Sequence, residues 1–128
     1  MKYTMKNIIL TATLVMLSFF KGNAQEVNAK ELVDPVAFEK QVTAKKVQLI
    51  DVRTPKEYQE GTIFNAININ FLGDDFDTKI TKLDVTQPVY IFCQSGKRSA
   101  AAAKKMQDAG FQVIELAGGY KAWKAEKD

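Results

Sequence analysis

The chain has 128 residues, of which 46% are hydrophobic and 26% are charged, and this is enough for one globular domain with its own core. It contains one cysteine and no histidine. Intrachain disulfides and cysteine–histidine catalytic pairs are therefore excluded, and a metal site built from soft ligands has no support. We expect neither a metal nor another cofactor.

The first residues have the pattern of a secretory signal peptide. Lys2 and Lys6 precede residues 8–20, an uncharged and largely apolar stretch that is too short to span a bilayer comfortably. Gly22 and Ala24 supply the small side chains that signal peptidase accepts near its cut. We expect cleavage after Ala24 and export, to a periplasm in preference to the cell exterior. An uncleaved membrane anchor and a buried first helix are the alternatives.

The formal net charge of +3 belongs to this N-terminal segment. Residues 1–24 hold three of the eighteen basic residues (Lys2, Lys6 and Lys21) and none of the fifteen acidic ones, so residues 25–128 are formally neutral. A neutral domain gives no support to nucleic-acid binding, or to a stable membrane association after cleavage. We expect residues 25–128 to form a single domain, and no pattern assigns its oligomeric state.

Residues 25–128 alternate between helical and extended patterns, without internal repeats. Proline and glycine mark several of the expected boundaries. In chain order, we expect a helix from Asp34–Pro35 to Lys45–Lys46, a strand over 47–52, a short helix from Thr54–Pro55 through Tyr58, a strand over 66–69, a helix over 74–83, a strand over 89–92, a helix over 99–109 capped by Gly110, a strand over 111–116, and a last helix after Gly118–Gly119.

This alternation predicts an α/β fold of three layers, in which a mostly parallel central sheet of about five strands carries helices on both faces. In sheets of this kind, functional sites lie at the carboxyl ends of the strands. Asp51, Arg53 and Cys93 all fall at predicted strand ends. We therefore expect these three side chains to lie near one another.

Cys93 stands where an apolar strand, a tight turn and a helix start meet. The sequence VYIF at residues 89–92 precedes it, and QSGKRS at residues 94–99 follows. Backbone N–H groups of such a turn and of the first helical turn favour a negative charge at the sulfur. Gly96 permits a positive φ that turns successive N–H groups toward it. We interpret Cys93 as a reactive thiolate, and an inert buried cysteine is the alternative.

Lys97 and Arg98 add positive charge at the mouth of this turn. An oxyanion such as thiosulfate or phosphate would suit them, and the guanidinium of Arg98 can make a bidentate contact. For Lys97, a solvated surface cation is the simpler interpretation.

Four segments together resemble a single-domain rhodanese, in an exported form. They are LIDVRTPKEY at residues 49–58, GTIFNAINI at 61–69, CQSGKRS at 93–99 and GGYKAW at 118–123. They occur in the order of that family, and the match runs over most of residues 30–125. The resemblance implies the rhodanese-like fold and sulfurtransferase activity. A thiosulfate-like donor would give its outer sulfur to the cysteine as a persulfide, and a thiophilic acceptor, cyanide or a thiol, would remove it.

The same resemblance implies the roles of the loop residues. Cys93 would be the nucleophile and sulfur carrier, and Arg98 would bind or steer the anionic donor. The persulfide would be cradled by backbone groups of the loop, which consists of Gln94, Ser95, Gly96, Lys97, Arg98 and Ser99.

Phosphatases share this fold family, and loop length separates the two activities. Four residues separate Cys93 from Arg98. In the phosphatases that this family resembles, five residues separate the corresponding cysteine and arginine. The shorter loop predicts a smaller pocket, which suits a persulfide better than a phosphoryl transition state. Phosphatase activity is therefore the less favoured alternative.

Three further residues of the matched segments are expected to support the site. Asp51 could cap the turn at Thr54 or pair with Arg53, and we favour this scaffold role over acid–base work. Glu57 is a candidate partner for Arg98 or Arg53, although a surface carboxylate on a short helix is the simpler interpretation.

One matched segment departs from the family. Rhodaneses commonly have a segment similar to Gly-His-Ile-Pro-Gly-Ala at the place where this chain has GTIFNA, residues 61–66. The chain thus loses a histidine and a proline turn. The geometry of Thr62-Ile63-Phe64-Asn65 is therefore not expected to follow the family, while the thiol chemistry is less affected.

Two functions of other classes stay open. A rhodanese-like binding module would dock a partner or a small anion without turnover, and its cysteine would be incidental. The intact loop from Cys93 to Arg98 favours the enzyme, because a module of that kind has no chemical need for a thiol there. A redox role through mixed disulfides is disfavoured because the chain has no resolving cysteine.

Overall fold

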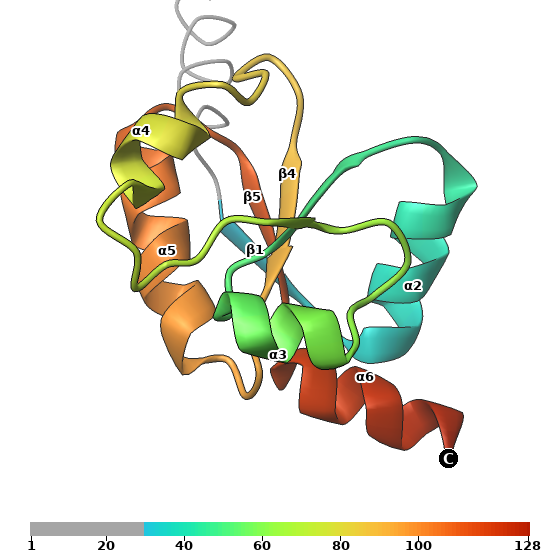
Figure 1. The fold of residues 1–128 in the computed structure, drawn as a ribbon. Coiled ribbons are helices and arrows are strands. Elements are labelled where there is room, and N and C mark those ends of the chain that lie inside the picture. Colours follow the sequence, from blue (N-terminus) through green and yellow to red (C-terminus); the bar gives the residue numbers. More distant parts are fainter. Residues whose placement is uncertain (1–29) are drawn as a thin grey trace, which may run out of the picture.

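The computed structural model describes residues 30–128 (Figure 1). The predicted signal peptide, residues 1–24, lies outside the described residues, as do residues 25–29. Between residues 30 and 128, no helix combines the length and the apolar character needed to cross a membrane.

Strands and helices alternate along the described chain. In order, they are β1 (Lys30–Val33), α2 (Pro35–Ala44), β2 (Gln48–Asp51), α3 (Pro55–Glu60), β3 (Ile67–Asn68), α4 (Phe76–Ile80), β4 (Val89–Phe92), α5 (Lys97–Asp108), β5 (Val113–Leu116) and α6 (Gly119–Lys127).

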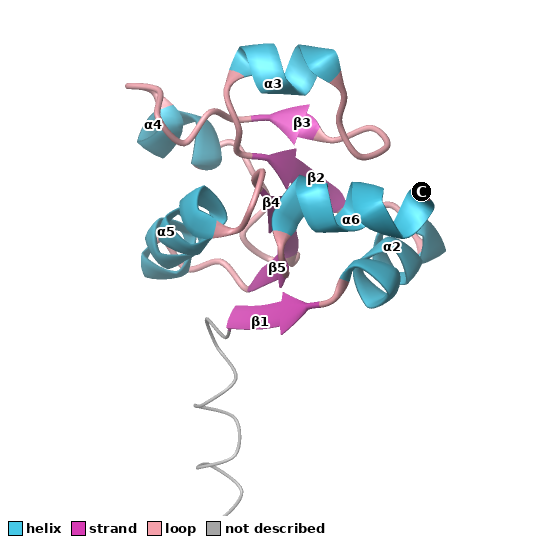
Figure 2. Ribbon diagram, turned by 90° about the horizontal axis from the view of Figure 1, so that it is seen from below, coloured by secondary structure: helices cyan, strands magenta, loops and turns pink. Residues whose placement is uncertain are grey.

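The five strands form one parallel sheet in the order β1-β5-β4-β2-β3. Helices α2 and α6 cover one face of the sheet, and α4 and α5 cover the other (Figure 2). The predicted α/β class, with a parallel sheet between two helical layers, is therefore confirmed. Strand β4 is central, so its carboxyl end opens into the middle of the sheet edge, where α3, the start of α5 and α6 also lie (Figure 1).

The central strand is apolar throughout because both of its faces are covered. Val89 and Ile91 belong to the core under α4 and α5, whereas Tyr90 and Phe92 belong to the core under α2 and α6. All four residues are buried. The continuous apolar run that predicted this strand thus reflects burial on two sides.

Several element boundaries differ from the sequence-based expectation. Strand β1 was not predicted, because it is a short edge strand on which Leu32 stays 63% exposed and no alternation is visible. Strand β3 has two residues rather than the four expected over 66–69. Helix α4 is shorter than residues 74–83, and α5 begins at Lys97 rather than at residue 99.

Two helix starts follow the capping rules that predicted them. The side chain of Asp34 accepts a hydrogen bond from the N–H of Ala37 at 2.9 Å, with Pro35 as the first helical residue. Thr54 and Glu57 form a reciprocal capping box at the start of α3. The second cap fixes Glu57, whose carboxylate faces the site described below.

Helix α6 is docked on the loop that follows β4. The N–H of Tyr120 donates to the carbonyl of Cys93 at 2.7 Å, and the N–H of Lys121 donates to the carbonyl of Gln94 at 3.1 Å. Gly118 and Gly119 precede these residues with φ values of 74° and 67°. A Cβ on Gly119 would lie 2.5 Å from the carbonyl oxygen of Cys93, so only glycine permits this close approach.

We expect Gly119→Ala to lower the free energy of unfolding by at least about 2 kcal/mol, because the added Cβ strains a left-handed residue and also meets the loop backbone. Gly110→Ala is the matched control, since Gly110 also has a positive φ of 98° but its Cβ would meet nothing closer than 3.5 Å. That variant should lose about 1 kcal/mol. Urea unfolding of both variants measures the difference, and equal losses would show that the close approach has no energetic weight.

Candidate active site

The candidate nucleophile lies at the carboxyl end of the central strand. Cys93 follows β4 directly, and its residue surface is 1% exposed. The next residues turn sharply, and Gly96 adopts a φ of 108° immediately before α5 begins. The predicted strand, tight turn and helix start therefore meet at this sulfur.

The turn directs hydrogen-bond donors at the sulfur. The N–H of Gly96 donates to the Cys93 Sγ at 3.0 Å. Burial alone would raise the pKa of the Cys93 thiol, but hydrogen bonds from the Ser99 hydroxyl and from the N–H groups of Ser99, Gly96 and Ser95 outweigh it, so the pKa lies below its ordinary value. This environment favours the thiolate, which is the nucleophilic form.

Arg98 and Glu57 form an ion pair at the mouth of the loop. Two guanidinium nitrogens donate to the two carboxylate oxygens, Nη1 to Oε1 at 2.6 Å and Nη2 to Oε2 at 2.9 Å. The hydrogen bond with Arg98 lowers the pKa of Glu57 from 4.5 to about 2. The same contact raises the pKa of Arg98. Glu57 is thus a partner of Arg98, one of the two partners that the sequence suggested, rather than a lone surface carboxylate.

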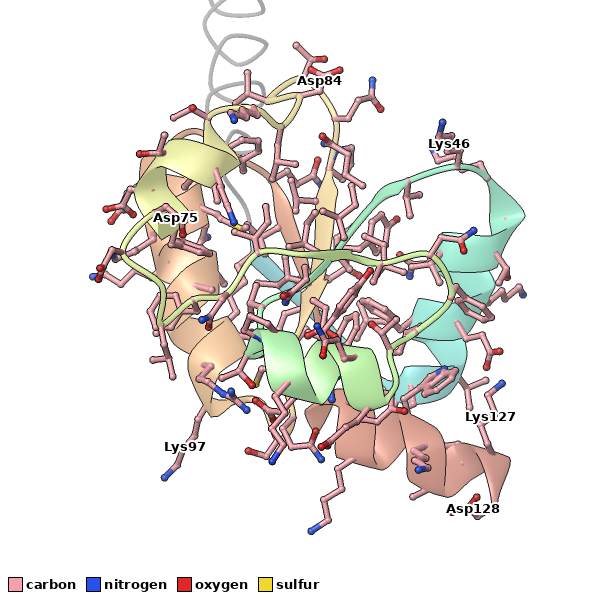
Figure 3. The ribbon with its side chains drawn as sticks, in the orientation of Figure 1. Lys46, Asp75, Asp84, Lys97, Lys127 and Asp128 are labelled. Carbon is pink, nitrogen blue, oxygen red and sulfur yellow. The ribbon has the colours of Figure 1, made fainter. Side chains whose placement is uncertain are left out.

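Lys97 takes no part in this pair. It is exposed at the first position of α5, and its side chain points away from the protein (Figure 3). The interpretation of Lys97 as a surface cation agrees with this placement.

Asp51 and Arg53 form a buried ion pair beside the loop. Both residues are nearly inaccessible, at 0% and 2% exposure, and Arg53 Nη2 lies 2.7 Å from Asp51 Oδ2. Asp51 also accepts a hydrogen bond from the backbone N–H of Arg53, so its role is that of a scaffold. The guanidinium further donates to the Gln94 side chain and the Gly61 carbonyl, and it stacks on the ring of Tyr120 at 4.2 Å. This one side chain therefore ties β2, the loop and α6 together.

The segment that departs from the family closes a turn of its own. Thr62 donates to Asp51 Oδ2 at 2.9 Å, and the N–H of Ala66 donates to the carbonyl of Ile63 at 3.1 Å. Phe64 lies within this turn at a φ of 47°, a strained conformation for an aromatic residue. The residue is 47% exposed, and its ring packs edge-on against Trp123. The turn thus reaches Asp51 through Thr62, without histidine or proline.

A pocket of about 380 Å³ lies beside the loop. Arg53, Glu57, Gln94, Tyr120 and Lys124 are among its lining residues, so its wall is polar and carries both signs of charge. Gln94 belongs to the loop, so the pocket borders the loop.

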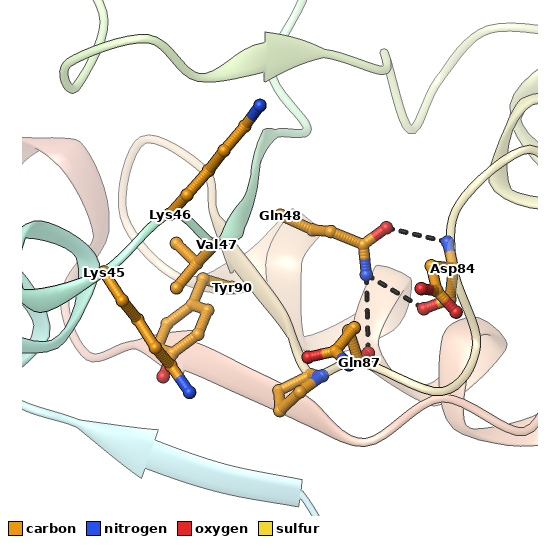
Figure 4. A pocket seen from close by; sticks show the side chains of 8 residues that line it. Lys45, Lys46, Val47, Gln48, Asp84, Gln87 and Tyr90 are labelled. Carbon is orange, nitrogen blue, oxygen red and sulfur yellow. Dashed lines mark hydrogen bonds between the residues drawn. The ribbon is translucent and has the colours of Figure 1, made fainter.

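A second pocket, of about 350 Å³, lies at the opposite end of the sheet (Figure 4). It surrounds Gln48, whose amide donates to the carbonyl of Asp84 at 2.9 Å and accepts from the Asp84 N–H at 2.7 Å. These bonds fasten the start of β2 to the segment before β4. None of its lining residues belongs to the loop from Cys93 to Ser99, so this pocket is not part of the candidate active site.

The residues singled out in the sequence come together at one end of the sheet, with Asp51, Arg53 and Glu57 grouped around the loop that runs from Cys93 to Ser99.

The sequence analysis missed Glu115. It is 2% exposed and accepts a hydrogen bond from the Ser99 hydroxyl at 2.6 Å. A carboxylate within an otherwise apolar strand is the signal that could have revealed it. Within residues 30–128, no group of three side chains is arranged to hold a metal ion.

Comparison with known proteins finds a family model and several relatives, some named as sulfurtransferases and one, from Pelagibacter ubique, named as a tRNA uridine(34) hydroxylase. A family model described as "Rhodanese-like domain" matches residues 34–126. The putative sulfurtransferase YtwF of Bacillus subtilis is 33% identical over 97 residues, which are 76% of this chain and 92% of that protein. The thiosulfate sulfurtransferase GlpE of Shewanella oneidensis is 33% identical over 81 residues, 62% of this chain and 78% of its own. YqhL of Bacillus subtilis, an uncharacterised protein, is 36% identical over 80 residues, and the match spans 62% of each chain.

Solved structures agree with the sequence comparison. A rhodanese-related protein from Thermoplasma volcanium superimposes with a TM-score of 0.67 at 27% identity, covering 75% of this chain and 92% of that one. The family model covers most of the chain, and the thiol loop, strands β2 to β5 and helices α2 to α5 lie within it. The chain therefore belongs to the rhodanese-like family, and relatives of it are named as sulfurtransferases.

Proposed function

We propose that this protein moves a sulfane sulfur from a thiosulfate-like donor to cyanide or a thiol through a persulfide on Cys93. The donor set around the sulfur is the observation that carries the proposal. The N–H of Gly96 lies 3.0 Å from Sγ, and the hydrogen bonds of the loop hold the pKa of the thiol below its ordinary value. The names of the sulfurtransferase relatives support the same class of reaction.

The proposed reaction has two displacement steps. The Cys93 thiolate attacks the outer sulfur of thiosulfate, the S–S bond of thiosulfate breaks, and sulfite leaves with the bonding electron pair. Cyanide then attacks the outer sulfur of the persulfide, thiocyanate leaves, and the Cys93 thiolate is restored. The N–H groups that favour the thiolate also suit the anionic persulfide, which replaces one negative sulfur by another.

Arg98 is the residue we propose for holding the donor anion. Its guanidinium has five N–H donors, and the pair with Glu57 uses two of its nitrogens. Donors are left for a sulfonate oxygen, while Glu57 keeps the guanidinium at the mouth of the loop. Glu57 also neutralises part of the charge that attracts an anion, so it lowers the affinity for the donor.

A binding module without turnover is the second candidate. The 1% exposure of Cys93 favours the binding module, because so little exposed surface hinders the access of a substrate to the sulfur. The lowered pKa of the thiol favours the enzyme, since docking of a partner would not require a thiolate.

Intact mass spectrometry of the purified protein before and after thiosulfate tests sulfur transfer. We expect the mass to increase by one sulfur atom and to return to its first value after cyanide, with thiocyanate appearing in solution. The chain has one cysteine, so the adduct can be assigned to Cys93. Cys93→Ser is the matched control and should gain nothing. A folded protein whose free thiol takes no sulfur from thiosulfate or from other persulfide donors would support the binding module instead.

The ion pair of Glu57 predicts a pH-dependent stability. Because the pKa of this carboxyl is about 2 in the folded protein and 4.5 ordinarily, its stabilising effect is complete above pH 4.5 and is lost as the pH falls toward 2. Glu57→Gln should therefore lower the free energy of unfolding by about 1 kcal/mol at pH 7, since the pair is partly exposed, and by progressively less in acid.

Urea unfolding of this variant at pH 7 and pH 3 measures the effect. Asp75→Asn, which removes the exposed pair of Asp75 with Lys79, is the control and should change stability by less than about 0.5 kcal/mol at either pH. A Glu57→Gln difference that is equal at both pH values would contradict the role of the charged pair.

Export to a periplasm is part of the proposal and depends on residues 1–24. We expect the full chain, expressed in a bacterium with two membranes, to be recovered from the periplasmic fraction with the mass of residues 25–128. Ala24→Asp should block cleavage and leave the longer chain in the membrane fraction. Recovery of the uncleaved wild-type chain from the cytoplasm would contradict export.

A further inference from the structure

Two opposite charges without partners line the pocket beside the thiol loop. Glu60 is the last residue of α3 and Lys124 lies in α6, and both line the pocket of about 380 Å³. Both residues are exposed, and within residues 30–128 neither makes a hydrogen bond or an ion pair. The pocket therefore offers one free carboxylate and one free ammonium, from two different helices.

The other charged groups of this pocket already have partners. The guanidinium of Arg53 is paired with Asp51, and both carboxylate oxygens of Glu57 accept hydrogen bonds from Arg98. These pairs cancel much of their own charge. A molecule in the pocket therefore meets chiefly the two unpaired charges, which are of opposite sign.

Gln94 adds a neutral donor whose orientation is fixed. Its oxygen Oε1 accepts a hydrogen bond from Arg53 Nη1 at 3.1 Å. A guanidinium has donors only, so the amide cannot exchange its oxygen and its nitrogen at this contact. Arg53 is itself held by Asp51 and by the carbonyl of Gly61. The NH₂ group of Gln94 thus keeps its donors, and among the described residues no group accepts from them.

These groups match a ligand that carries both signs of charge. A carboxylate can accept from the ammonium of Lys124 and from the amide of Gln94, while an ammonium suits the carboxylate of Glu60. A ligand with one sign of charge would be attracted by one of the two unpaired residues and repelled by the other. The volume of the pocket suits a small molecule.

We propose that this pocket binds the sulfur acceptor and selects a small thiol that carries one carboxylate and one ammonium group, of amino-acid or short-peptide size. Lys124 and Gln94 hold the carboxylate, and Glu60 holds the ammonium. Gln94 follows Cys93 directly in the loop, so a ligand bound to its amide lies beside the residue that carries the sulfur.

This inference rests on the proposed function, because it names the acceptor of that reaction. The acceptor thiolate attacks the outer sulfur of the persulfide, and the bond between that sulfur and Cys93 Sγ breaks. The electron pair of this bond stays on Cys93 as the thiolate, and the acceptor leaves as its own persulfide. Cyanide has no group that can use Lys124 and Glu60 together, so the pocket does not favour it.

Thiol–disulfide exchange tests the pocket without any sulfur donor. The Cys93 thiolate attacks a symmetric disulfide, one half stays on Cys93 as a mixed disulfide, and the other half leaves as a thiolate. Intact mass spectrometry measures the rate, and the chain has one cysteine to react. The probes are cystine, which is zwitterionic in each half, cystamine, which is cationic, dithiodipropionate, which is anionic, and hydroxyethyl disulfide, which is neutral.

Each variant is compared with the wild type for the same disulfide, so the intrinsic reactivity of the disulfide cancels. Lys124→Gln should slow cystine and dithiodipropionate by about threefold to fivefold, as expected for an exposed charge contact, and should not slow cystamine. Glu60→Gln should slow cystine and cystamine by a similar factor, and should not slow dithiodipropionate. Gln94→Met removes the amide donor and should slow the same two disulfides as Lys124→Gln.

None of these variants should slow hydroxyethyl disulfide once the rates are corrected for the reactivity of the thiol, which iodoacetamide reports. Urea unfolding checks that each variant is folded. Lys56→Gln on α3 and Glu126→Gln on α6 are the matched controls, because they remove the same charges from the same helices at exposed positions that do not line the pocket. They should leave all four rates unchanged.

Two results would overturn the proposal. Control variants that change the rates as much as Lys124→Gln and Glu60→Gln would assign the effect to the net charge of the protein. Variants in the pocket that slow the neutral disulfide as much as cystine would show that no charged group of the ligand is recognised there.

The exchange assay also separates this inference from the proposed function. A protein that takes no sulfur from thiosulfate or from other persulfide donors, yet shows the selective losses, would refute sulfur transfer and leave the pocket as a site for zwitterionic thiols. A protein that forms the persulfide but reacts with all four disulfides independently of Lys124 and Glu60 would refute the zwitterionic acceptor alone.

Discussion

The site depends on a backbone constraint, the capture of two loop carbonyls by the first turn of α6. The carbonyls of Cys93 and Gln94 are bound by N–H groups of Tyr120 and Lys121, so the peptide planes of the loop have a fixed direction. Once those oxygens face α6, the N–H groups that follow turn toward the sulfur, and Gly96 completes the curve with a positive φ. The electrostatics of the thiol thus originate in packing between backbones.

Two ion pairs hold the rest of the site. Asp51 with Arg53 lies inside, and Glu57 with Arg98 lies at the mouth. The inner pair is inaccessible and joins separate elements, so it acts as a scaffold, whereas the side chains of the outer pair are 25% and 28% exposed. The two ion pairs are chemically similar and differ in burial. The buried pair of Asp51 with Arg53 stabilises the fold, and the partly exposed pair of Glu57 with Arg98 is accessible to solutes.

Much of this arrangement could be predicted from local sequence. The strand at residues 89–92, the capped helix starts and the glycine turn are encoded by short-range preferences, and the parallel sheet followed from their order. Strand β1 and Glu115 were missed, because each depends on neighbours distant in the chain. A four-residue edge strand and one carboxylate have no periodicity, so only the folded sheet shows what they contact.

The docking of α6 has a consequence for synthesis. A ribosome adds the loop at Cys93 before it adds Gly119–Lys127, yet the carbonyls of the loop find their partners only in that last helix. Until α6 has been added and has folded onto the loop, the carbonyls of Cys93 and Gln94 lack the N–H partners that fix the loop around the sulfur, so the site is completed last.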